Sequence, residues 1–160
     1  RLPPAEVADL EFCHVSDLPR QLLLQKAREA TIKPSDSKPL YRCGAGLTSC
    51  YVTAEGMVQP CTSTTRYGVP YARGGLRAAF REGRRALEAR HAPAGFLCAS
   101  CADRPICNSC PPLAEMDCGD EAGRFAYACS LAKERSRRLA EVEEREKNAK
   151  EGFPVGDRCD

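Results

Sequence analysis

The sequence is poor in the residues that normally build a hydrophobic core. It contains no tryptophan, and 28 of its 160 residues are Leu, Ile, Val or Phe. That fraction lies below the roughly 20% at which a chain becomes short of core-forming residues. A domain with so little apolar volume usually needs disulfides or metal to offset the conformational entropy lost on folding. We therefore expect something other than apolar packing to stabilise this fold.

The sequence also lacks a strong net charge and a long hydrophobic segment. Its 24 basic and 22 acidic side chains leave a net charge of +2, so no strong field indicates nucleic acid or an anionic membrane as a partner. The longest run of large apolar residues is Leu22 to Leu24, which is far too short to span a membrane. We expect neither a nucleic-acid partner nor a membrane partner.

Cysteine is the residue type that the sequence has in unusual number. There are eleven cysteines, whereas a secreted disulfide framework normally has an even number in a shorter chain. The odd number counts against a disulfide scaffold, which stays open as an alternative. Such a scaffold predicts no metal and one or more unpaired thiols. The spacing of the cysteines favours a metal site instead.

Turn signals and apolar periodicity predict three consecutive parts, within an α+β fold. The fold would be a small cysteine-rich, metal-pinned domain with a β-hairpin, short helices and long loops, followed by a charged C-terminal helix. The three parts would be a lead-in at residues 1–39, a cysteine-rich domain at residues 40–135 and a charged helical tail at residues 136–160. The lead-in would contain a strand at residues 6–15, a helix at residues 21–30 and a linker at residues 34–37.

Two elements are predicted inside the cysteine-rich domain. Residues 50–59 have the pattern of a β-hairpin, with Gly56 where the loop requires a left-handed residue. Apolar residues at i, i+4, i+7 and i+11 predict an amphipathic helix over residues 76–90; these are Leu76, Phe80, Gly83 and Leu87. We expect the surrounding arginines to form a solvated face rather than a binding patch; they are Arg73, Arg77, Arg81, Arg84, Arg85 and Arg90. A last helix is expected to start near Phe125 and to be solvated or frayed in its charged part.

The central motif is CASCADRPICNSC, in which Cys98 and Cys101 form one Cys-x2-Cys pair and Cys107 and Cys110 form another. A tight turn between two such cysteines brings both sulfurs to one side, and its backbone N–H groups can donate to the thiolates. Four soft thiolates in so short a segment select zinc, copper(I) or an iron–sulfur cluster over hard cations. A tetrahedral zinc site is the alternative, but zinc ribbons usually separate their two pairs by about 15–20 residues. The close spacing therefore favours a cluster.

Upstream of this motif lie Cys43, Cys50 and Cys61, and four residues separate Gly56 from Cys61. Together with the central motif and Cys129, the pattern resembles the SPASM domain. That domain is the C-terminal auxiliary-cluster domain of radical S-adenosylmethionine enzymes that modify peptides and proteins. The strings CGAGLTSCYVTAEGMVQPC and CPPLAEMDCGDEAGRFAYAC also resemble that family. The resemblance covers about residues 40–135.

The resemblance implies two auxiliary [4Fe–4S] clusters that take the place of the missing core. The family usually has three residues between the last two cysteines of the central motif, whereas this chain has two. That difference leaves Cys118 as a conceivable substitute for Cys110, and the position of Cys50 varies in the family. The first cluster would be held by Cys43, Cys61 and Cys110, with Cys50 as fourth ligand, and the second by Cys98, Cys101, Cys107 and Cys129.

The catalytic signature of radical S-adenosylmethionine enzymes is Cys-x3-Cys-x2-Cys, and no three cysteines of this sequence have that spacing. The resemblance thus implies the C-terminal part of an oxidoreductase that matures a peptide or protein, inactive alone. S-adenosylmethionine and a third [4Fe–4S] cluster would belong to a preceding barrel, whose tail would be residues 1–39. The auxiliary clusters would transfer electrons or bind the substrate.

The partners that the resemblance implies are a peptide or protein substrate and an electron donor of the flavodoxin or ferredoxin type, in the cytoplasm. The competing class is a non-catalytic zinc module, structural or partner-binding, whose arginine-rich helix contacts a partner.

Overall fold

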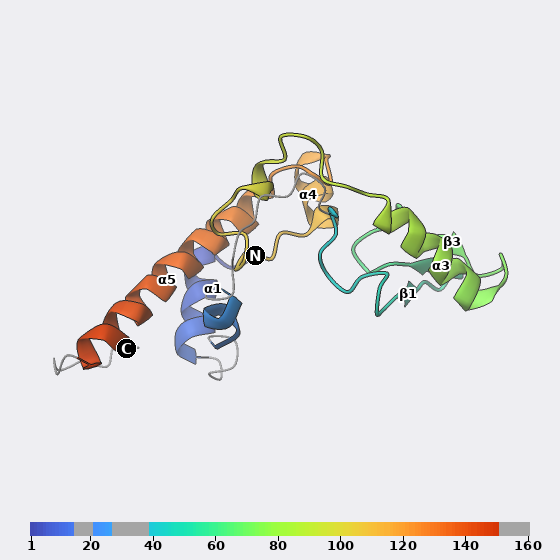
Figure 1. Ribbon diagram of the computed structural model, residues 1–160. Coiled ribbons are helices and arrows are strands. Elements are labelled where there is room, and N and C mark those ends of the chain that lie inside the picture. The colour runs from blue at the N-terminus through green and yellow to red at the C-terminus, as the bar shows by residue number, and fades with distance from the viewer. Residues whose placement is uncertain (15–20, 27–38, 151–160) are drawn as a thin grey trace. The chain divides into compact units, whose positions relative to one another are not determined.

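The computed structural model describes residues 1–14, 21–26 and 39–150 (Figure 1). It mixes helices with a three-stranded antiparallel sheet, so the predicted combination of helix and strand is confirmed. The chain divides into two compact units, each assembled from separate segments of sequence. The first unit comprises Arg1–Lys33, Ser100–Ser109 and Phe125–Asp160, and the second comprises Pro34–Ala99 and Cys110–Arg124.

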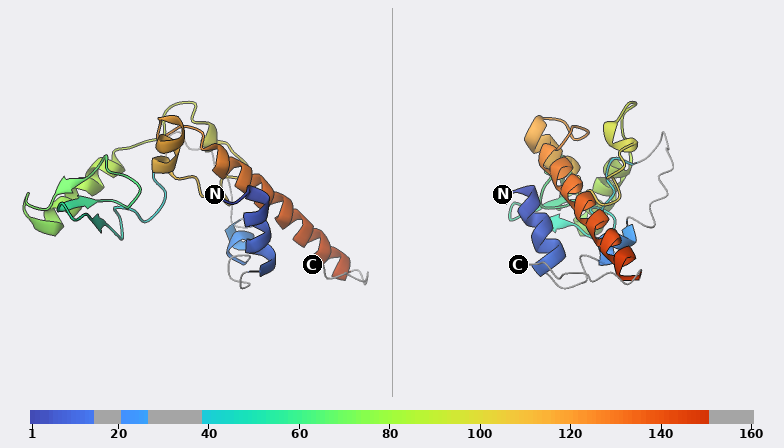
Figure 2. Two further views of the ribbon diagram at one scale, coloured as in Figure 1. Left: turned by 180° about the vertical axis from the view of Figure 1, so that it is seen from behind. Right: turned by 90° about the vertical axis from the view of Figure 1, so that its left-hand side faces the viewer.

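In the first unit, two helices run side by side. The α1 helix (Pro4–Asp9) continues into a π-helical segment, η1 (Leu10–His14), and α1 lies alongside α5 (Ala126–Lys150) in both views of Figure 2. The strand predicted at residues 6–15 is therefore wrong as far as residue 14. Pro4 occupies the first turn, where a missing N–H costs nothing, and Ala8 is fully buried. Packing against α5 has outweighed the local strand propensity.

A small apolar core stabilises this unit. Leu23 and Leu24, from a helical turn at residues 21–26, pack with Ile106 and Leu139. The predicted helix at residues 21–30 is confirmed over residues 21–26, whereas its remainder and the linker at residues 34–37 lie outside the described residues. The predicted last helix is present as α5. Its charged part stays helical through Lys150 rather than fraying, because Leu139 there is buried in the core.

The second unit contains the sheet, whose strands are β1 (Tyr51–Val52), β2 (Met57–Gln59) and β3 (Val69–Pro70), in the order β1-β2-β3. Val58 pairs with Val52 on one side and with Val69 on the other. The predicted hairpin is confirmed as β1 and β2, and Gly56 in its loop has a φ of +76°. The strand β3 was not predicted from the sequence, because it is short and ends in a proline.

The predicted amphipathic helix is present as α3 (Gly75–Glu88), which packs on β2 and β3 (Figure 1). Its buried face differs from the predicted one, because Ala79, Gly83 and Leu87 are buried whereas Leu76 is 46% exposed. A Cβ at Gly83 would lie 3.1 Å from the carbonyl oxygen of Tyr67. The close approach of the chain therefore selects small residues at this contact. No helix among the described residues has the length and apolar character to cross a membrane.

Candidate functional site

Cys110, a predicted cluster ligand in the second unit, has a raised pKa. Burial raises the pKa of the Cys110 thiol, and Cys61 and Cys43 raise it further because neighbouring thiolates repel one another. Cys43 precedes β1, Cys61 follows β2, and Cys110 precedes α4 (Pro111–Cys118). The thiols whose charges act on Cys110 therefore come from two segments that are far from it in the sequence.

A glycine allows the segments of Cys43 and Cys61 to meet. Gly46 has a φ of +67°, a left-handed conformation that residues with side chains rarely adopt. Its backbone N–H donates to the carbonyl oxygen of Pro60 over 3.2 Å. A Cβ at Gly46 would lie 3.2 Å from Leu87 Cδ2 and 3.4 Å from Pro60 Cβ. Because Gly46 has no side chain, the loop after Cys43 can lie directly against the residue that precedes Cys61.

Cys110 lies at the N-terminus of a helix, as the N-cap residue of α4. Pro111 and Pro112 fill the first two helical positions, where a residue without an N–H costs no hydrogen bond. Leu113 is therefore the first helical residue with a backbone N–H. Its hydrogen bond lowers the pKa of Cys110 and opposes the larger effect of burial. The positive end of a helix also stabilises a thiolate.

Cys50 and Cys118, the other two cysteines considered as ligands of the first cluster, lie in different parts of the second unit. Cys50 is exposed immediately before β1, and Cys118 is exposed in the last turn of α4. The Cys118 thiol donates to the Ala114 carbonyl oxygen over 3.1 Å, within its own helix. None of the contacts described for the second unit brings Cys50 or Cys118 to the other three thiols. The identity of a fourth ligand for the first cluster stays a prediction.

The predicted second set of ligands is divided between the units. Cys101, Cys107 and Cys129 belong to the first unit, and the Cys107 thiol donates to the carbonyl oxygen of Ala128 over 3.8 Å. Cys107 therefore lies close to the first turn of α5, which carries Cys129. Cys98 lies in a 3-10 turn, η2 (Leu97–Ala99), which belongs to the second unit. The grouping of these four cysteines stays a prediction.

A buried arginine holds the loop that carries Cys107. The Arg135 side chain on α5 is only 5% exposed. Its Nη1 donates to the carbonyl oxygen of Ile106 over 2.9 Å, and its Nε and Nη2 donate to the two carboxylate oxygens of Glu11 over 2.7 and 2.5 Å. Ser136 Oγ donates to Asp103 Oδ1 over 2.5 Å. Neighbouring residues of α5 thus fix both the loop and η1.

Glu121 belongs to no motif that the sequence reveals, yet its carboxylate is the centre of a polar network in the second unit. Its side chain is 2% exposed. The hydroxyl of Tyr41 donates to Oε1 over 2.5 Å, and the hydroxyl of Tyr67 donates to Oε2 over 2.7 Å. Arg90 Nη2 donates to Oε2 over 3.1 Å, and Arg66 Nε lies 3.9 Å from Oε1. Both oxygens therefore have phenolic and cationic neighbours.

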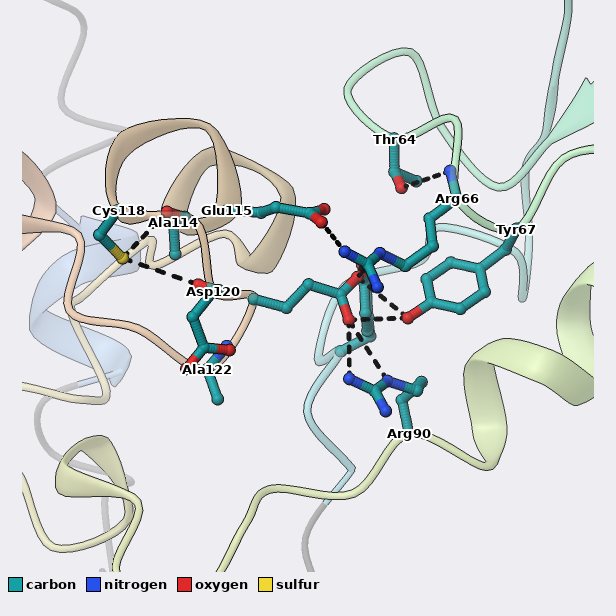
Figure 3. A network of polar contacts seen from close by, with 11 residues as sticks. Thr64, Arg66, Tyr67, Arg90, Ala114, Glu115, Cys118, Asp120 and Ala122 are labelled. Carbon is teal, nitrogen blue, oxygen red and sulfur yellow. Dashed lines mark hydrogen bonds and ion pairs between the residues drawn. The ribbon is translucent and has the colours of Figure 1, made fainter.

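Local turn chemistry places Glu121 in this position. Gly119, with a φ of +80°, ends α4, and the Asp120 carboxylate accepts the backbone N–H of Ala122 over 2.9 Å. The carboxyl group of Glu115, one turn before the end of α4, pairs with Arg66. Figure 3 shows the side chain of Arg66 reaching the Glu115 carboxylate, with Arg90 coming from a separate segment. The turn after α4 is therefore bound to the loop that follows Cys61.

The electrostatics of the network favour an ionised Glu121. Burial raises its pKa, but hydrogen bonds from Tyr41, Tyr67 and Arg90, with the charge of Arg90, outweigh burial and bring the pKa below its ordinary value. Burial raises the pKa of Tyr41, and the bond to Glu121 raises it further. The pKa of Tyr67 is raised by the same two causes. At neutral pH the network therefore contains a carboxylate and two neutral phenols.

The donor chemistry of the Cys43, Cys61 and Cys110 group suits an iron–sulfur cluster. Thiolates are the ligands that such clusters and zinc select. Among the described residues, no three or more Cys, His, Asp or Glu side chains converge as they would around one metal ion. The assignment of these three thiols to a cluster stays a prediction.

Comparison with protein-family models gave no match, and comparisons with curated proteins and with solved structures gave none either. The resemblance to the SPASM domain thus depends on the cysteine spacing and the local strings around it.

Proposed function

We propose that this chain is an auxiliary iron–sulfur module of a radical S-adenosylmethionine enzyme that modifies a peptide or protein. The observation that carries the proposal is the double Cys-x2-Cys motif, combined with Cys43 and Cys61 upstream, whose charges act on Cys110. Cys110 belongs to both features, because it ends the motif and is affected by Cys43 and Cys61. A poor core supports the same conclusion, since ligation would supply the stability that apolar packing does not.

The residues of the chain would hold two [4Fe–4S] clusters. Cys43, Cys61 and Cys110 would bind the first, with Cys50 as the fourth ligand. Cys98, Cys101, Cys107 and Cys129 would bind the second. When bound, the clusters supply one-electron transfer at a potential set by hydrogen bonding and solvent exposure. The Leu113 N–H is one donor that would tune the first site.

Because the sequence contains no Cys-x3-Cys-x2-Cys motif, S-adenosylmethionine cleavage would take place in another part of the same enzyme. The module would exchange electrons with a substrate radical, or bind the peptide or protein substrate, and a flavodoxin or ferredoxin would be its electron donor. A reducing compartment such as the cytoplasm fits this chemistry, since cluster assembly requires cysteines that have not formed disulfides.

The decisive experiment measures iron, acid-labile sulfide and zinc in protein reconstituted without oxygen, together with its absorption spectrum. We expect about eight irons and eight sulfides per chain and a broad band at roughly 400 nm that bleaches on reduction. About four irons would mean that one ligand set is wrong. Zinc without sulfide would refute the proposal and favour a structural zinc module.

The parent coding sequence supplies a second test. We expect a Cys-x3-Cys-x2-Cys segment upstream of these residues. A full-length parent without that segment would refute the assignment to a radical enzyme, even if the module binds clusters.

A further inference from the structure

Two partners of Glu121, Tyr41 and Tyr67, lie in segments that carry candidate cysteines of the first cluster. Tyr41 precedes Cys43 with one residue between them, and Tyr67 lies in the loop that follows Cys61. Glu121 itself follows α4, whose N-cap is Cys110. Two hydrogen bonds, at 2.5 Å from Tyr41 and at 2.7 Å from Tyr67, therefore join all three cysteine segments at one carboxylate.

Further contacts strengthen this connection. Arg66, also in the loop after Cys61, pairs with Glu115 on α4 and lies 3.9 Å from Glu121. The rings of Tyr41 and Tyr67 meet edge to face, with centroids 5.9 Å apart. The backbone N–H of Leu40 donates to the Arg90 carbonyl oxygen over 2.9 Å. The segments are thus connected by aromatic and backbone contacts as well as by the carboxylate.

The three cysteine segments are far apart in the sequence, so they need contacts that hold them together. The apolar core at the network consists of Leu40, Tyr41 and Leu87, and the partly buried Tyr67, Phe96 and Ala122 pack against it. Burying a carboxylate is costly unless it is well hydrogen-bonded, and Glu121 meets that condition through three side chains.

We propose that Glu121 is a positioning residue that holds the Cys43, Cys61 and Cys110 segments together for the first iron–sulfur cluster. This inference rests on the proposed function of the chain. Glu121 acts through Tyr41 and Tyr67 and does not itself bind iron. With the network intact, the three thiolates are preorganised for a cluster, and a cluster once bound is retained.

The test compares Glu121→Gln and Tyr41→Phe with the control Glu82→Gln. Glutamine keeps the shape of Glu121 but presents an NH2 group to donors, and phenylalanine keeps the Tyr41 ring while removing its hydrogen bond. Glu82 is an acid of the same unit whose side chain is 56% exposed and pairs with Arg73. All variants are reconstituted with iron and sulfide without oxygen as the full chain.

Two readouts are taken on each protein: the rate at which an iron chelator removes iron, and the midpoint potential of the first cluster. The phase that disappears in Cys61→Ser identifies that cluster. We expect about tenfold faster iron loss in Glu121→Gln, because a hydrogen bond to a charged group contributes about that factor or more to stability. Tyr41→Phe should lose iron several-fold faster, and both variants should shift the potential. Glu82→Gln should match the wild type.

The outcomes separate this inference from the proposed function. A wild-type chain that takes up no iron and sulfide refutes the function. A wild-type chain that binds clusters, with Glu121→Gln and Tyr41→Phe unchanged in both readouts, overturns the role of Glu121 alone. If circular dichroism shows that Glu121→Gln is unfolded, Tyr41→Phe decides: faster iron loss with a shifted potential supports the inference, and wild-type behaviour overturns it.

Discussion

Replacing Arg135 with methionine should destabilise the first unit of the chain. The guanidinium is 5% exposed and donates to both carboxylate oxygens of Glu11 and to the carbonyl oxygen of Ile106. Methionine retains most of the apolar volume, so the change removes the charge and its hydrogen bonds while largely preserving packing. The loss of stability should therefore measure the contribution of the polar contacts of Arg135 and not the effect of a cavity.

The expected magnitude follows from the burial of the two partners. Removing one member of a buried ion pair costs about 3–5 kcal/mol, because the other charge stays buried without compensation. The Glu11 side chain is 22% exposed, so water can reach it and the cost moves to the lower end of that range. The Ile106 carbonyl also loses a donor, which adds to the loss. We expect the free energy of unfolding of this unit to fall by about 3 kcal/mol.

The assay has to be local, because a chain with two compact units need not unfold in a single step. Native-state hydrogen exchange, followed by mass spectrometry on peptides from α5, measures the opening free energy of the first unit directly. Arg137→Met is the matched control, since Arg137 lies on the same helix, is 48% exposed and pairs with Glu134 and Glu141. That control should be indistinguishable from the wild type. A change of less than about 1 kcal/mol in Arg135→Met would refute the reasoning.

Three further changes test the second unit. Because the folded-state pKa of Glu121 lies below its ordinary value, the stability that this carboxylate contributes is present above the ordinary pKa and is lost as pH falls through the folded-state pKa. Urea midpoints of the wild type should therefore drop more steeply with acid than those of Glu121→Gln; parallel curves would contradict this. Gly46→Ala should reduce stability by about 2 kcal/mol, and Gly56→Ala by about 1 kcal/mol, because both impose a left-handed conformation but only Gly46 would also crowd neighbouring atoms. Equal losses in urea unfolding would show that the contacts of Gly46 are unimportant. Cys61→Ser should remove about four irons per reconstituted chain, whereas Cys118→Ser should remove none; iron analysis that gives the reverse would reassign the ligand.

The elements predicted correctly from the sequence have local signals. The hairpin follows from Gly56 between two short apolar segments, and the helix α3 follows from a periodicity that stays within one element. The strand predicted at residues 6–15 failed because Ala8 is buried through contact between α1 and α5, which are distant in the sequence. The exposure of Leu76 was unpredictable for a similar reason, since the close approach at Gly83 determines which face of α3 is buried.

In the candidate site, too, local sequence patterns reveal some residues and miss others. The cysteine motifs are visible because the proposed ligands have short, regular spacings in the sequence. Glu121 and Arg135 are invisible to such reasoning, because each is one charged residue among many in its segment. The partners of Glu121 lie 31, 54 and 80 residues away along the chain. Their convergence on Glu121 is a property of the folded chain. Arg90, which was expected on a solvated face, is one of these partners.

The sequence distance between Tyr41 and Glu121 also sets an order of events during synthesis. The hydrogen bond between them spans 80 residues, and ribosomes add about 5–20 residues per second. For roughly 4–16 seconds after Tyr41 is made, the segments of Cys43 and Cys61 exist without the carboxylate that joins them. The last-made part of the second unit, the turn that carries Glu121, therefore completes the network.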